Sequence, residues 1–197
     1  MKEIITWVAI WFSAWGAFNY KLNWNKAKTF VQRYIITSLF FLISTIIAIY
    51  IFDILESSNL YLILIGSIIS MFLGTLLSNY YPFYKRIISG KYFLVSLVFD
   101  ILFQQIMVIA GIKVLENYYR SGYLDLYFGI LFMIGHLPII FLKWAKMRYF
   151  YLIATLFGGT IFSYLINNYL NGPVYNFLIH YFVYICLFYY LKDERKI

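Results

Sequence analysis

Charged residues are scarce in this chain of 197 residues. Asp, Glu, Lys and Arg together make up 12% of the sequence, about half of their usual share in soluble domains. Hydrophobic residues reach 63%, which excludes an ordinary soluble domain and indicates an integral membrane protein. The length allows several membrane crossings of about 20 residues each and leaves no room for a separate soluble domain. We therefore predict one all-α transmembrane helix bundle over residues 1–197.

The chain also has only one cysteine and two histidines. The lone Cys186 excludes an internal disulfide framework and a thiolate metal cluster, and its apolar segment predicts a buried, inert side chain. His136 and His180 without a clear third ligand would make a poor zinc site; Asp100 could supply that ligand, but no metal or other cofactor is predicted. The net charge of +8 falls in short clusters between apolar runs, so nucleic acid is not a predicted partner.

Seven apolar segments are each close to the length that crosses the hydrocarbon core of a bilayer. Their approximate bounds are 4–20, 34–52, 60–80, 92–115, 124–142, 149–170 and 173–191. The connections after the first, third and fifth segments, together with the C-terminal tail, hold 13 of the 16 Lys and Arg residues. The positive-inside rule therefore predicts seven crossings, with the N-terminus outside and the C-terminus in the cytoplasm. We expect a prokaryotic plasma membrane.

Polar side chains interrupt three of these apolar segments. They are Asp100, Gln104 and Gln105 in the fourth segment, His136 in the fifth and His180 in the seventh. At about 1.5 Å per residue, Gln104, His136 and His180 lie roughly 18, 9 and 17 Å from the cytoplasmic boundary, a depth at which they could line one cavity. Ionisable groups at such depth commonly mark function. A lone glutamine is more often a contact between helices, and a lone histidine is as often structural.

Proline and glycine predict three local features. Pro138 follows His136 by two residues; it removes a helical hydrogen bond and predicts a kink beside that histidine. The Gly158-Gly159 pair predicts a close approach between helices, and Gly172-Pro173 predicts a tight turn before the last segment.

Three short patterns follow one another in the second half of the chain. They are the glutamine pair at 104–105, the sequence FMIGH over 132–136, and a glycine-containing helix pair from 157 to His180. In order and spacing they resemble the CAAX prenyl endopeptidase and bacteriocin-processing family of intramembrane proteases, abbreviated CPBP or Abi, over residues 92–191. That family carries Glu-Glu-x-x-x-Arg, Phe-x-x-x-His and His-x-x-x-Asn or Asp on successive helices. The resemblance implies a site at Gln104, Gln105, His136 and His180 that takes a hydrophobic or lipidated peptide, or a partner protein.

The departures from the family pattern fall at the positions that carry its chemistry. Gln104 and Gln105 stand in place of the two glutamates, Ile109 in place of the arginine, and Tyr184 in place of the last Asn or Asp. In the family, a glutamate is taken to activate water while the histidines support the developing oxyanion. A carboxamide cannot accept a proton near neutral pH, so the glutamines could position water but could not deprotonate it.

Three explanations of the glutamine pair are compatible with the sequence. The first is a natural pseudoprotease that binds membrane peptides or a lipidated C-terminus. Such a protein would have a role close to peptide processing, export or bacteriocin immunity. The second is an active, metal-independent endopeptidase that uses Asp100, one helical turn before Gln104, as its base. The third is a deliberate replacement of glutamates for structure determination. A small transporter or channel component is a more distant alternative, because the sequence shows no inverted repeat.

Overall fold

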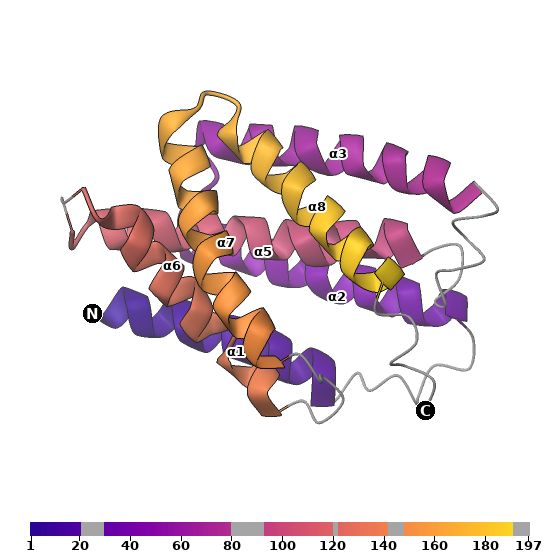
Figure 1. Cartoon of the computed structure of the whole chain (residues 1–197), viewed down its shortest axis with the longest axis horizontal. Helices are drawn as coiled ribbons and strands as arrows, with labels where there is room; N and C mark the ends of the chain where they lie inside the picture. Colours follow the sequence, from indigo (N-terminus) through magenta and orange to yellow (C-terminus); the bar gives the residue numbers. More distant parts are fainter. Residues whose placement is uncertain (21–29, 80–92, 120–121, 142–147, 191–197) are drawn as a thin grey trace.

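The computed structural model describes residues 1–20, 30–79, 93–119, 122–141 and 148–190. Within these residues the chain is all-helical, as the composition predicts (Figure 1). The elements are α1 (Lys2–Tyr20), α2 (Phe30–Ile51), α3 (Ser58–Asn79), α5 (Phe93–Glu116), α6 (Leu124–Gly135), the 3-10 helix η1 (Leu137–Phe141), α7 (Arg148–Asn168) and α8 (Gly172–Tyr190). Their bounds follow the seven apolar segments closely, except that α6 is much shorter than its segment.

Four of these helices are long and apolar enough to cross a membrane. Their apolar spans are Tyr34–Ile51, Ser58–Ser78, Leu94–Glu116 and Tyr149–Asn168, and α6 is a shorter apolar helix. The chain is therefore a membrane protein surrounded by a lipid bilayer. The seven crossings and the orientation of the termini remain predictions, because most of the Lys and Arg residues that support them lie outside the described residues.

Large apolar side chains point outward from several helices. On α2, Leu39, Ile43 and Ile46 are all exposed, at the spacing of a single helix face, which suits contact with lipid. Cys186 on α8 is also exposed, so the prediction of a buried cysteine is wrong. Its position places it on the outer face of α8 with Phe182 and Val183, which are exposed as well.

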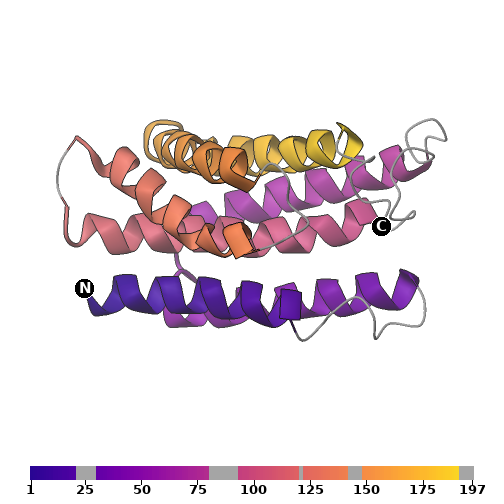
Figure 2. The same cartoon turned by 60° about the horizontal axis from the view of Figure 1, so that its bottom comes forward.

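Helix α5 is the central element of the bundle. It contacts α1, α2, α3, α6, α7 and α8, and 83% of its apolar span is buried. Figure 2 shows α1 and α2 as one layer on one side of α5, with α7 and α8 on the opposite side. Because helices cover most of α5, the polar side chains buried on it must find protein partners.

Helices α6 and α7 approach each other through two glycines. A Cβ atom on Gly129 would lie 2.6 Å from the Leu156 carbonyl oxygen, and one on Gly159 would lie 2.7 Å from the Phe132 Cβ. The predicted close approach at Gly159 is confirmed, whereas Gly158 faces open space. Small residues of this kind allow helix backbones to come together inside a membrane.

A polar contact at the N-terminal end of α6 also joins it to α7. Ser163 Oγ donates a hydrogen bond of 2.6 Å to Asp125 Oδ1, and Asn167 Nδ2 donates one of 3.0 Å to the same oxygen. Ser163 and Asn167 are one turn apart and so present their side chains to α6 from one face of α7. This contact and the glycine pair together fix the position of α6, and with it the position of His136.

The kink predicted beside His136 is confirmed. Helix α6 ends at Gly135 and the chain continues as η1 from Leu137. Pro138 has no backbone N–H to offer to the preceding turn, so the α-helical ladder stops just before it. The predicted tight turn before α8 is also confirmed, since Gly172 N donates to Tyr169 O at 2.9 Å.

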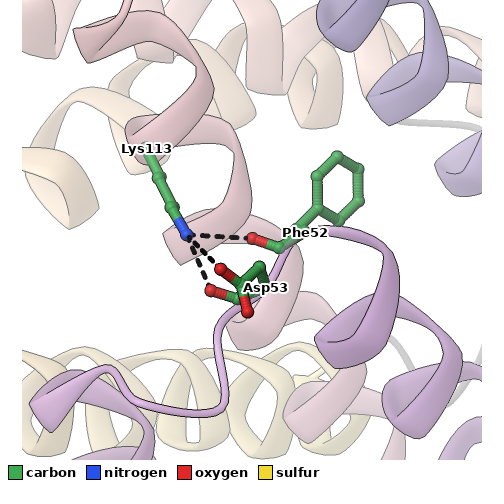
Figure 3. Close-up of polar contacts among 3 residues, drawn as sticks. All are labelled: Phe52, Asp53 and Lys113. Carbon is green, nitrogen blue, oxygen red and sulfur yellow. Dashed lines mark hydrogen bonds and ion pairs between the residues drawn. The ribbon is translucent and has the colours of Figure 1, made fainter.

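Lys113 ties the C-terminal end of α5 to the turn after α2. Its Nζ donates to the carbonyl oxygens of Phe52 and Asp53, at 3.1 and 2.7 Å (Figure 3). Asp53 has a φ of 50°, the left-handed conformation in which many helices end. The Asp53 carboxylate lies 4.0 Å from Lys113 Nζ and is itself well exposed, so the carbonyl contacts dominate this connection.

Replacing Lys113 with methionine should lower the free energy of unfolding by about 1 kcal/mol, because two carbonyl oxygens at the end of α2 lose their donor. SDS titration in mixed micelles, followed by circular dichroism, measures the change. Asp53→Asn is the matched control: it removes only an exposed ion pair and should leave stability almost unchanged. An equal loss in both variants would show that the ion pair carries the connection.

Candidate functional site

A continuous row of polar side chains joins α5 to α8. We call it the α5–α8 polar seam, and its members are Asp100, Gln104 and Gln105 on α5 with His180 and Tyr184 on α8. Asp100 and Gln104 are one turn apart, as are His180 and Tyr184, so each pair lies along one helix face. Gln104, Gln105 and His180 are buried, and the rest of the seam is half-buried.

The Gln104 amide connects three members of the seam. Its Nε2 donates to Asp100 Oδ1 at 3.0 Å and to the Tyr184 hydroxyl oxygen at 3.1 Å. The Tyr184 hydroxyl also lies 3.5 Å from Gln104 Oε1. Both N–H groups of the amide are therefore used, and the one carboxylate of the seam accepts a hydrogen bond from an amide.

Gln105 pairs directly with His180. Its Nε2 lies 2.9 Å from His180 Nδ1, and neither residue is appreciably exposed, at 0% and 6%. With the amide nitrogen as donor, His180 Nδ1 accepts and the proton of the neutral ring is on Nε2. His180 then presents an N–H donor on the side of the ring away from α5.

His136 lies in an aromatic enclosure near the seam. Its ring centroid is 4.5 Å from that of Phe132 and 5.2 Å from that of Trp11. His136 Nδ1 lies 2.8 Å from the Phe132 carbonyl oxygen; since a carbonyl can only accept, the proton of the neutral ring is on Nδ1. The Phe-x-x-x-His pattern thus has a local cause: the phenylalanine supplies both a carbonyl and a ring to the histidine one turn later.

Two phenylalanines connect the histidines through ring contacts. Phe132 packs against Phe162 with centroids 5.9 Å apart, and Phe162 packs against His180 with centroids 5.0 Å apart. The structure therefore brings Asp100, Gln104, Gln105 and His180 together by direct contact. His136 is joined to them through this aromatic contact.

Three parts of the arrangement are absent from the predicted site. Tyr184 is noted in the sequence only as a departure from a family pattern, yet it bonds Gln104. Asn176, fully buried on α8, lies one turn before His180, and the spacing 176, 180, 184 is a polar stripe that could have revealed both. The contacts of Trp7 and Trp11 of α1 could not be predicted from the sequence, because only the packing of α1 against α6 brings Trp11 to His136.

The chemistry available to the seam is hydrogen bonding more than proton transfer. Carboxamides donate and accept hydrogen bonds but do not exchange a proton near neutral pH.

Comparison with known proteins finds no match for this chain: no family model, no curated protein and no solved structure matches it. Within the described part of the chain, no three His, Cys, Asp or Glu side chains gather as a metal ion would require.

Tyr184→Phe should lower the free energy of unfolding by roughly 0.5–1 kcal/mol, because the buried Gln104 amide loses its partner on α8. In a double-mutant cycle with Gln104→Leu, the two losses should be non-additive by a similar amount. Tyr175→Phe, at an exposed position on the same helix, is the control and should change little. Fully additive losses at 104 and 184 would mean that the contact contributes nothing.

Proposed function

We propose that this chain is a divergent CPBP-like membrane protein that binds a hydrophobic or lipidated peptide without cleaving it. One observation carries the proposal: the His180 ring is paired with the Gln105 amide at 2.9 Å, at the position where the family keeps a carboxylate. An amide can orient His180 as a hydrogen-bond donor toward a peptide carbonyl. It cannot take a proton from water, which hydrolysis requires.

The hydrogen bonds of Gln104 support the same conclusion. Its amide donates to both Asp100 and Tyr184, so it acts as a bridge between α5 and α8 and has no proton-accepting role. These hydrogen bonds hold the polar side chains of the seam in place inside an apolar bundle. Roles close to peptide export, peptide processing or bacteriocin immunity suit a protein of this kind.

An active endopeptidase is the second candidate, and Asp100 is the residue that favours it. Asp100 supplies the one carboxylate of the seam and is only half-buried. Its Oδ1 accepts from Gln104 at 3.0 Å, which leaves the second carboxylate oxygen as the group that would act as a base.

The two candidates are separated in proteoliposomes that contain the purified protein. The probes are a fluorescent hydrophobic decapeptide and the same peptide with a farnesylated C-terminal cysteine. Binding is followed by fluorescence anisotropy and cleavage by mass spectrometry, for the wild type, Asp100→Asn and Gln104→Glu. The matched control is Asp125→Asn, which removes a charge outside the seam and keeps an oxygen that can accept from Ser163 and Asn167.

We expect the wild type and Asp125→Asn to bind at least one probe and to leave it intact after prolonged incubation. Asp100→Asn should behave in the same way. Cleavage by the wild type that disappears in Asp100→Asn but persists in Asp125→Asn would establish the endopeptidase and reject the proposal. Cleavage that appears only in Gln104→Glu would show that the site lacks nothing but its base.

A further inference from the structure

Two buried carboxamide oxygens, one in the α5–α8 polar seam and one a helical turn from its His180, accept no hydrogen bond from any described residue. They are Gln105 Oε1 and Asn176 Oδ1, and both side chains are 0% exposed. A buried acceptor without a donor is costly, so native proteins retain few of them without a reason. The hydrogen bonds described above for the seam do not account for either oxygen.

The two amides belong to one local group where α5, α7 and α8 meet. Asn176 and His180 are one turn apart on the same face of α8, and Gln105 contacts the His180 ring from α5. From α7, Phe162 contacts both α8 residues: its carbonyl oxygen accepts from Asn176 Nδ2 at 3.3 Å, and its ring packs on His180. Side chains on a helix lean toward its N-terminus, which tilts the His180 ring toward Asn176.

The chemistry of this group selects the kind of ligand. Both unpaired atoms are neutral acceptors, and Phe162, which contacts Asn176 and His180, is apolar and buried. A cation would need a compensating charge in such surroundings, and Asp100, the carboxylate of the seam, is engaged with Gln104. A neutral N–H donor requires no such compensation.

We infer that Gln105 and Asn176 form a subsite that accepts a hydrogen bond from the backbone N–H of a bound hydrophobic peptide. The inference rests on the proposed function. It specifies that the site recognises the main chain of the peptide through hydrogen-bond acceptors on α5 and α8. His180, paired with Gln105 and one turn after Asn176 on α8, supplies a donor for an adjacent backbone carbonyl. Recognition of this type is independent of the peptide's side chains.

The test replaces single amide bonds of the peptide with esters, which removes one N–H donor at a time. The probes are the plain and farnesylated decapeptides and their ester series, and the affinities come from anisotropy in proteoliposomes. In the wild type, one or two ester positions should weaken binding about three- to tenfold. In Asn176→Leu and Gln105→Leu, the all-amide peptide should bind less tightly, and the ester at that position should add no further loss.

Asn168→Leu, at the exposed end of α7, is the control and should keep the wild-type ester profile. Circular dichroism establishes that each variant is folded, and either Asn176→Leu or Gln105→Leu alone is sufficient for the comparison. If neither all-amide probe binds the wild type, the proposed function fails and the subsite with it. If a probe binds but no ester position matters, or the ester loss persists in both variants, the subsite alone is rejected.

Discussion

Replacing Trp7 with alanine should lower the free energy of unfolding by about 3 kcal/mol or more, because a large, fully buried ring leaves a cavity between α1 and α5. Trp7 is 0% exposed, and its ring stacks on Trp11 with centroids 5.0 Å apart. Its Nε1 donates to the Met107 carbonyl oxygen at 2.6 Å. Gly111 makes this approach possible, since a Cβ there would lie 3.0 Å from Trp7 Nε1.

The phenylalanine variant separates the two contributions at this position. Trp7→Phe retains an aromatic ring but loses the indole donor, and it should cost only about 1 kcal/mol. Unfolding in SDS mixed micelles, followed by circular dichroism, measures both variants. Equal losses in the two variants would assign the whole effect to the hydrogen bond and contradict the packing argument. Trp7 stacks on Trp11, and Trp11 contacts His136. Trp7→Ala should therefore also weaken peptide binding.

Replacing Gly129 with alanine should cost about 2 kcal/mol, although alanine is the better helix former. The added Cβ would meet the Leu156 carbonyl oxygen at 2.6 Å and the Thr160 backbone nitrogen at 3.1 Å. Backbone atoms of a helix cannot move aside as a flexible side chain can, so α6 and α7 must separate. The resulting displacement would carry Phe132 and His136 away from Phe162.

Gly158→Ala is the matched control for this effect. It lies in α7 one residue before Gly159, and its Cβ would meet no heavy atom within 4 Å. The variant should be more stable than the wild type by about 0.5–1 kcal/mol, because alanine loses less conformational entropy in a helix. If Gly129→Ala is stabilised to the same extent, the two helices do not approach as closely as described.

The helices themselves follow from the sequence for simple reasons. Runs of about 20 apolar residues must satisfy their backbone hydrogen bonds internally, so they become helices whatever their neighbours are. Pro138 stops the ladder beside His136 by removing one backbone N–H, which is also a local effect. The four-residue spacing of Asp100 and Gln104 similarly predicts a shared face, and the hydrogen bond between them is found.

The partners of the polar residues depended on tertiary structure. Spacing along α8 places Asn176, His180 and Tyr184 on one face, but only the rotation of α8 against α5 decides that His180 meets Gln105 and Tyr184 meets Gln104. The same rotation turns Cys186 outward, against the expectation of burial. Helix periodicity specifies which residues share a face, and it carries no information about what that face contacts.

The sequence by itself determined a helical membrane protein with a pair of glutamines and two histidines set into apolar helices, because composition, length and spacing act locally. Only the tertiary structure decided that Gln105 holds His180, that Gln104 bridges Asp100 to Tyr184, and that two phenylalanines connect His136 to His180. Those pairings arise from close packing of helices distant in sequence, where one glycine or one indole sets the separation.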